Sequence, residues 1–298
     1  PETRGLHDAF YPSSPRGLDT SWAPAGAFLD DFERFASACF GIAPRRAEVM
    51  DPQHRLLIEA TRWALQDAGL ERGGLERART GVFVGLSVSE FKNAMMARIR
   101  LTQAIAGDFG AALDSPDAAR LLGAVDRVAR TQSFSLSGSL QALAAASVAQ
   151  TFDLGGPAFT IDAACASANV AIHDAVTHLR AGALDVALAG GVYLNLSPDN
   201  LVAFTRIGAI SPSGRCRPFD ADADGFVQGE GVATFVLKRE RDVDPTRERV
   251  HALILGSGCN NDGRGEGPMT PRVEGQVAVL RAACEDAGLD PRDRKSVV

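Results

Sequence analysis

Hydrophobic positions recur along this chain with two periods, one helical and one strand-like. The first clear helical pattern covers residues 51–68, where Asp51 can cap the first turn, Pro52 suits the first helical position and Gly69 ends the pattern. The apolar face of this helix is predicted to hold Leu56, Ala60, Trp63 and Ala64.

Short apolar runs predict the buried strands of a sheet. They lie at residues 81–85, 159–161, 185–193, 231–238 and 250–255. Helical patterns over residues 138–150 and 166–180 lie before and after the second of these runs. A strand, a turn, a helix and a strand in this order form a βαβ unit, which implies parallel strands. The chain is therefore predicted to belong to the α/β class.

Two segments stand outside this pattern. Residues 1–36 are loop-like, and residues 86–130 are polar and weakly periodic, as expected of a long insertion that lies over the core as a cap. The chain also contains a short sequence echo, that is, a weak internal repeat. ALQDAGL at 64–70 is similar to ACEDAGL at 283–289, and each copy lies at the end of an amphipathic helix. The echo indicates two related halves.

Composition and charge exclude several classes. A chain of 298 residues with 45% hydrophobic content can bury a large core, and its net charge of -6 argues against general binding to nucleic acid or membrane surfaces. No uncharged apolar run could span a membrane, and the first residues lack the features of a signal peptide. The five cysteines form no CxxC pair and are odd in number, so we expect no disulfide framework, no zinc site and a cytoplasmic location.

One cysteine lies at a turn between a predicted strand and a predicted helix, in the segment GPAFTIDAACASA at 156–168. Free N–H groups and the helix dipole would favour a thiolate at Cys165. Ala164 and Ala166 are small and would leave room for a substrate chain. Cys165 is therefore a candidate nucleophile, although a buried cysteine with a packing role fits the same pattern.

This segment resembles the active-site block of β-ketoacyl synthases, where the cysteine lies in an Asp-Thr-Ala-Cys-Ser-Ser-like context. Here Ala163 replaces the threonine, and Ala166 with Ser167 replaces the serine pair. Further blocks agree in order and spacing: FGIAP at 40–44, DPQHRLL at 51–57, GVFVG at 81–85, RPFD at 217–220, GEG at 229–231 and NDG at 261–263. The resemblance covers nearly the whole chain and is strongest to ketosynthase domains of type I polyketide synthases.

The resemblance implies an α/β, thiolase-like αβαβα layered fold. Residues 1–241 would form a nearly complete N-terminal half, with the insertion at about 86–130, and residues 249–298 would begin a C-terminal half that is mostly missing. The chain is thus expected to be clipped at both ends, because the first half has no counterpart of the strand at 250–255 and the second half stops soon after the echo.

The resemblance also implies a reaction, in polyketide or fatty-acid-like biosynthesis. Cys165 would accept an acyl group from the phosphopantetheine of an acyl carrier protein, and its backbone N–H would be one oxyanion donor. Decarboxylative Claisen condensation with a malonyl-type extender would follow. Ala164, Ala166, Phe219 and Gly229 would contact the substrate. The family implies a homodimer with residues 134–150 near the contact, and neither a metal nor a bound cofactor.

The two histidines that promote condensation in this family lie in His-Gly-Thr-Gly-Thr-like and Gly-His-like contexts, and neither context occurs here. His173 and His178 follow Cys165 on the same predicted helix at roughly 12 and 20 Å along its axis, too far for direct contact. His54 is predicted to be solvated or to cap its helix, and His7 and His251 have no recognisable partner. The chain alone is therefore expected to accept an acyl group without extending it.

Several weaker signals have simpler explanations. The acidic segment 220–225 begins like a calcium-binding EF-hand loop, but Gly231 occupies the position that needs a glutamate. The glycines of 256–267 lack the spacing of a nucleotide-binding loop. Phe219 could equally be a core residue. The arginines that could steer an acidic carrier protein, or be scattered surface charges, are Arg206, Arg215 and Arg217.

Two other function classes remain open from the sequence. One is a non-catalytic chain, either a fragment or a pocket-shaping partner, although such partners lack the nucleophile that Cys165 would supply. The other is a thiolase that acts on coenzyme A esters. The Asp162-Ala163-Ala164-Cys165 context and the DPQ block argue against a thiolase.

Overall fold

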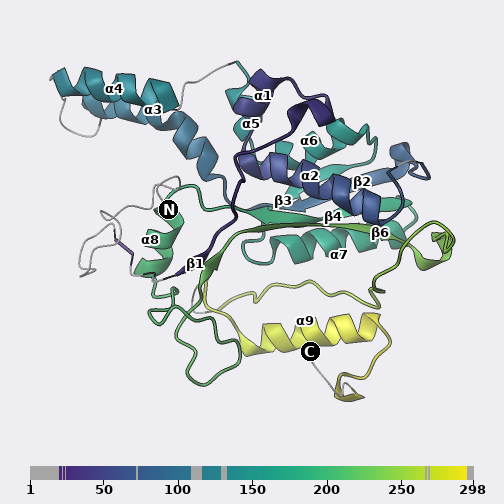
Figure 1. Cartoon of the computed structure of the whole chain (residues 1–298). Coiled ribbons are helices and arrows are strands. Elements are labelled where there is room, and N and C mark those ends of the chain that lie inside the picture. Colours follow the sequence, from purple (N-terminus) through teal and green to yellow (C-terminus); the bar gives the residue numbers. More distant parts are fainter. Residues whose placement is uncertain are drawn as a thin grey trace.

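The computed structural model describes residues 20–293 except residues 22, 24, 72, 109–115, 129–132, 266 and 268. Its centre is a sheet with the strand order β3-β2-β4-β6 (Figure 1). These strands are β2 (Thr80–Gly85), β3 (Ala158–Ile161), β4 (Val186–Tyr193) and β6 (Gly231–Lys238). β2, β3 and β4 are parallel, and β6 is antiparallel to β4. The parallel βαβ unit predicted from the sequence is confirmed.

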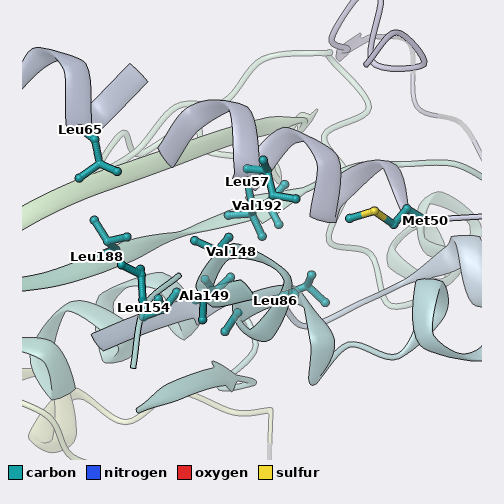
Figure 2. Close-up of a cluster of buried hydrophobic side chains, with 14 of the residues drawn as sticks. Met50, Leu57, Leu65, Leu86, Val148, Ala149, Leu154, Leu188 and Val192 are labelled. Carbon is teal, nitrogen blue, oxygen red and sulfur yellow. The ribbon is translucent and has the colours of Figure 1, made fainter. Parts of the chain in front are cut away.

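Helices cover both faces of this sheet. α2 (Pro52–Asp67) and α6 (Leu143–Phe152) pack on one face, and α7 (Ser167–Arg180) packs on the other (Figure 1). Figure 2 shows part of the larger apolar cluster, where Leu57, Val148 and Leu188 meet between helices and sheet. The smaller cluster, on the α7 face, surrounds the fully buried Phe83. Burial of each such large side chain contributes about 1.5–3 kcal/mol.

Helix α2 begins and ends where the sequence predicts, and its predicted apolar face is partly confirmed, because Ala60 is buried and Leu56 packs against the core. The Asp51 side chain accepts a hydrogen bond from the Gln53 N–H at 2.8 Å, and Gly69 ends the helix in the left-handed conformation. Leu57 and Leu65 point into the core, whereas Trp63 is 62% exposed. The sequence of α2 is compatible with more than one apolar face. Packing against the sheet determines which of them is buried.

The single helix predicted at 138–150 is in fact two helices, α5 (Ser135–Ser139) and α6. The Gly138 carbonyl accepts a hydrogen bond from the Asp51 N–H at 2.7 Å instead of continuing a helix. A side chain at this position would place its Cβ 1.8 Å from the Val49 carbonyl oxygen. A backbone contact that is distant in sequence therefore breaks the helix, and hydrophobic periodicity gives no sign of it.

The insertion predicted at about 86–130 contains two helices, α3 (Glu90–Ala106) and α4 (Pro116–Val128). The Ser89 side chain caps α3, and Gly107 ends it with a left-handed backbone. α3 contacts both α4 and α5, and α3 and α4 project away from the sheet (Figure 1). That this segment acts as a cap stays a prediction.

The C-terminal part lies below α7 in Figure 1, where an extended segment is followed by α9 (Val273–Asp286). The layers thus run helix, sheet, helix, extended segment, helix. Residues 250–255 were predicted as a buried strand, but they form no ladder with any described residue, and Val250, Leu253 and Leu255 are about half exposed. An apolar run becomes a strand only when a neighbour pairs with its backbone groups.

Smaller elements complete the described part. β1 (Gly26–Ala27) pairs in parallel with β5 (Gln228–Gly229). The other short helices are η2 (Ser37–Phe40), α1 (Pro44–Glu48), η3 (Arg77–Arg79), α8 (Asp199–Arg206), η4 (Glu240–Asp242) and η5 (Pro291–Asp293). The loop predicted at 1–36 lies partly outside the described residues. Within the described ranges, no helix has the length and apolar character needed to cross a membrane.

The sequence echo has a structural counterpart, because α2 and α9 end in the same way. The N–H of Leu70 bonds to the carbonyl of Leu65 at 2.9 Å, and the N–H of Leu289 bonds to that of Cys284 at 2.9 Å. Gly69 and Gly288, one position earlier, are both left-handed. These matching helix ends support the prediction of two related halves.

Candidate active site

Cys165 lies in the turn that connects β3 to α7, at the carboxyl edge of the parallel strands. β3 ends at Ile161, and Ala166 is the N-cap residue of α7. The Cys165 side chain is exposed to solvent, so it is not the buried packing residue that the sequence left open. Its position beside the first turn of a helix allows a substrate to approach the sulfur.

A compact set of hydrogen bonds shapes this turn. Ala164, just before the cysteine, has a φ of 50°, in the left-handed region that residues with a Cβ rarely adopt. Its N–H donates to Asp162 Oδ1 at 3.0 Å. The Ser167 hydroxyl donates to the Ala164 carbonyl at 2.6 Å and accepts from the Ala163 N–H at 2.9 Å. The Ser167 side chain thus closes the turn around Cys165.

Two glycines allow α7 to start so close to the sheet. A Cβ at Gly85, the last residue of β2, would lie 2.4 Å from the Ala168 nitrogen. A Cβ at Gly191 in β4 would lie 2.9 Å from the Ala168 Cβ. Ala164 and Ala166, by contrast, are exposed, which leaves space around the thiol. Glycine within an apolar strand run is the sequence signal for this close approach.

The N-terminus of α2 holds the loop that follows β2, beside this turn. The Gln53 side-chain amide donates to the Val88 carbonyl at 2.9 Å, and its oxygen accepts from the Leu194 N–H at 3.2 Å. The Ser89 hydroxyl donates to Asp51 Oδ2 at 2.6 Å. Asp51 and Gln53 are fully buried. The DPQ block therefore ties α2 to the ends of β2 and β4.

His54 contradicts its sequence-based expectation, because it is fully buried rather than solvated or capping. Asp51 provides the cap of α2, and neither ring nitrogen of His54 has a hydrogen-bond partner. Burial lowers the pKa of His54 below its ordinary value of 6.5, and the Asp51 carboxylate opposes this effect. His54 is therefore held as a neutral imidazole inside the protein.

No described histidine contacts Cys165. His173 Nδ1 lies 2.9 Å from Ser257 Oγ, and His178 packs against Phe83 with its Nδ1 2.9 Å from the Asp174 carbonyl. His251 pairs with Asp67, a partner that its sequence context did not reveal. His7 lies outside the described residues. Each of these described histidines thus has a partner other than Cys165.

Phe219 and Gly229, the other predicted substrate contacts, are not joined to Cys165 by any hydrogen bond or ring contact in the described structure. Phe219 is fully exposed with a φ of 63°, so it is not a core residue. Gly229 lies in β5 and pairs with Ala27. The nearby Arg217 donates to the Asp222 carbonyl at 2.9 Å. No cluster of potential metal ligands occurs among the described residues.

Glu90, at the start of α3, is a buried carboxyl group that the sequence did not single out. Glu90 is 2% exposed and accepts hydrogen bonds from the backbone of Leu196 at 2.5 Å and Ser197 at 2.8 Å. Burial raises the pKa of the Glu90 carboxyl, while these hydrogen bonds lower it. Burial also raises the pKa of Tyr193 to about 12. The Glu90 hydrogen bonds anchor the start of α3 to the segment that follows β4.

Comparison with known proteins identifies the family of this fold and turn. Residues 1–243 match the family described as beta-ketoacyl synthase, N-terminal domain, and residues 251–297 match beta-ketoacyl synthase, C-terminal domain. The chain belongs to the β-ketoacyl synthase family. Its α/β fold is thiolase-like, as the sequence predicted, and the match favours a β-ketoacyl synthase over the thiolase alternative.

Polyketide synthases are among the relatives of this ketosynthase chain. It is 40% identical over 274 residues to one component of the phenolphthiocerol/phthiocerol polyketide synthase of Mycobacterium tuberculosis, a match that covers 92% of this chain and 13% of that protein. A different component of the same synthase, from the same organism, is 38% identical over 294 residues, a match that covers 98% of this chain and 14% of that protein. The chain thus spans a small part of the length of these relatives.

Solved ketosynthase structures superpose on the chain. The oxazolomycin ketosynthase domain of Streptomyces albus gives a TM-score of 0.80 at 31% identity and covers 98% of this chain and 45% of its own. The ketosynthase from module 6 of the bacillaene synthase of Bacillus subtilis gives a TM-score of 0.76 at 31% identity, covering 98% and 43%. The architecture described above is therefore that of a ketosynthase.

Proposed function

We propose that this chain performs the acyl-transfer step of a polyketide-synthase ketosynthase, with Cys165 as the nucleophile. The observation that carries the proposal is the exposed Cys165 thiol in a hydrogen-bonded turn at the start of α7. The sulfur attacks the carbonyl carbon of an acyl thioester on the phosphopantetheine of an acyl carrier protein. The new C–S bond forms as the old one breaks, and the carrier thiol leaves with the proton that Cys165 released.

The surroundings of the thiol suit this step. The Cys165 backbone N–H is assigned as one donor to the oxyanion of the tetrahedral intermediate. Ala164 and Ala166 are exposed beside it and would border the acyl chain. Phe219 and Gly229 are proposed to line the path further from the sulfur. They would contact the acyl chain only when the substrate is bound.

Condensation is proposed as the second step of the reaction. A malonyl-type extender loses carbon dioxide, and its enolate carbon attacks the Cys165 thioester, which forms a carbon–carbon bond and releases the thiol. No described histidine reaches the sulfur, so we propose that the chain as given loads an acyl group but extends it poorly. General acid–base groups typically contribute about 10²- to 10⁴-fold to such rates.

The proposed partners and setting follow from the same assignment. An acyl carrier protein brings the substrate, and no resident metal or cofactor is required. We propose a homodimer in which residues 134–150 lie near the contact, because Phe134 and Leu136 at the start of this segment are 51% and 63% exposed. We propose a cytoplasmic location, because all five cysteines are free.

The decisive experiment is acyl loading followed by intact-mass measurement. The purified protein is mixed with an acyl carrier protein that bears an acyl thioester, and we expect one added acyl group that is lost in Cys165→Ala. Cys216→Ala is a matched control, since Cys216 is also exposed and free. Equal loading of the Cys165→Ala variant would contradict the proposal.

A further inference from the structure

The Ser87 hydroxyl reaches the turn that holds Cys165 from a neighbouring loop. Ser87 Oγ lies 3.0 Å from the Ala164 carbonyl oxygen and 2.9 Å from Ser167 Oγ. Ser167 Oγ lies 2.6 Å from the same carbonyl oxygen. Two hydroxyl groups therefore converge on one backbone oxygen, that of the residue directly before Cys165.

That residue is the strained one. Ala164 has a φ of 50°, and a residue with a Cβ gains by leaving this region unless other contacts oppose the change. Rotation of the Ala164 backbone would swing its carbonyl away from both hydroxyls and move Cys165 with it. The two hydrogen bonds therefore oppose the relaxation that would displace the thiol.

Ser87 can resist such a movement because its own loop is fixed at several points. The Gln141 side-chain amide donates to the Ser87 carbonyl at 2.9 Å. The Leu86 N–H donates to the Ile161 carbonyl at 3.1 Å. The contacts from Gln53 to Val88 and from Ser89 to Asp51, described above, hold the rest of residues 86–89. These contacts fix the loop 86–89 in place, so Ser87 can support the turn that holds Cys165.

We infer that Ser87 is a positioning residue for the nucleophile, which acts through the Ala164 carbonyl to hold Cys165 where an acyl donor can reach it. This inference rests on the proposed function, since it assumes that Cys165 is the acylated group. Ser87 touches the backbone of the turn and not the sulfur. Its loss should therefore slow acylation more than it weakens binding of the acyl donor.

The first test measures the rate of Cys165 acylation against the concentration of an acyl-pantetheine thioester. Ser87→Ala should lower the maximal rate about five- to tenfold, as expected for one lost hydrogen bond, and leave the half-saturating concentration unchanged. Ser87→Thr keeps the hydroxyl and should restore the rate to within about twofold. Ser257→Ala is a matched control, because it removes a 2.9 Å contact with His173 further along α7 and should leave the rate unchanged.

The second test asks whether Ser87 acts through Ala164. Glycine adopts the left-handed conformation freely, so in an Ala164→Gly background the change Ser87→Ala should slow acylation by less than about twofold. An equal loss in both backgrounds would overturn the inference, as would a normal rate for Ser87→Ala alone. Absence of acylation in the unmodified protein would instead refute the proposed function, so the two failures are distinguishable.

Discussion

His54 shows how burial can reverse an expectation drawn from one residue and its neighbours. A histidine in the first turn of a helix is usually solvated, but the fold encloses this one completely. An imidazole without hydrogen-bond partners is tolerated inside a protein only in its neutral form. Protonation of His54 should therefore make the free energy of unfolding depend on pH.

Stability should fall in mild acid because of His54. The pKa of His54 is lowered in the folded protein, so below its ordinary value of 6.5 the unfolded chain binds a proton that the folded protein rejects. The free energy of unfolding should drop between pH 7.5 and 5.5 by up to about 1.4 kcal/mol more than in His54→Gln. Urea unfolding at both pH values measures this, and parallel loss in the two proteins would contradict it.

The candidate nucleophile was predictable because its signal is local. An apolar run, small residues and a helical period surround Cys165 within a few positions. Ser87 was not predictable in the same way, because it meets the turn only after β2 and β3 lie side by side. A hydroxyl that supports a site from a neighbouring loop carries no local sequence pattern.

At the scale of elements, the buried strands and α2 were predicted almost residue by residue, while the breaks between elements were not. The apolar runs of β2 and β4 are continuous because helices cover both faces of the sheet. The division between α5 and α6 depends on Gly138 and its contact with Asp51, which are far apart in the sequence. Strand pairing also depends on residues far apart in the sequence, so the unpaired state of the segment 250–255 was not predictable from its local pattern.

The contact between α7 and the end of β2 gives a prediction at this scale. In Gly85→Ala the new Cβ would meet backbone atoms of Ser167 and Ala168 at 2.6 and 2.4 Å, and backbone cannot rotate away. We expect a loss of about 1–3 kcal/mol in the free energy of unfolding and slower acylation of Cys165. In Gly123→Ala the added Cβ meets no atom within 4 Å, which makes it a matched control for thermal melts and loading assays. Normal stability and loading of Gly85→Ala would show that the turn does not need this close packing.

At the scale of the whole molecule, ion pairs help join the C-terminal part to the rest, and a hollow of about 1090 Å³ lies between α2, α7, β6 and the extended segment. Lys238 pairs with Glu248 at 2.7 Å, and Arg180 pairs with Asp286 at 2.6 Å. The hollow is lined by apolar residues such as Leu237 and Leu253 and also by charged residues such as Arg239 and Glu240. Division into a first half at 1–241 and a second beginning at 249 stays a prediction.

The central claim is that the fold makes one cysteine of five chemically special. Cys39, Cys165, Cys216 and Cys259 are all exposed, so exposure alone would label them at similar rates. Of these four, Cys165 lies next to Ala166, the N-cap residue of the long helix α7, and its sulfur is the proposed nucleophile. The most direct measurement is brief iodoacetamide treatment at neutral pH followed by peptide mapping. The account predicts that Cys165 is labelled first, and preferential labelling of any other cysteine with Cys165 unmodified would contradict it.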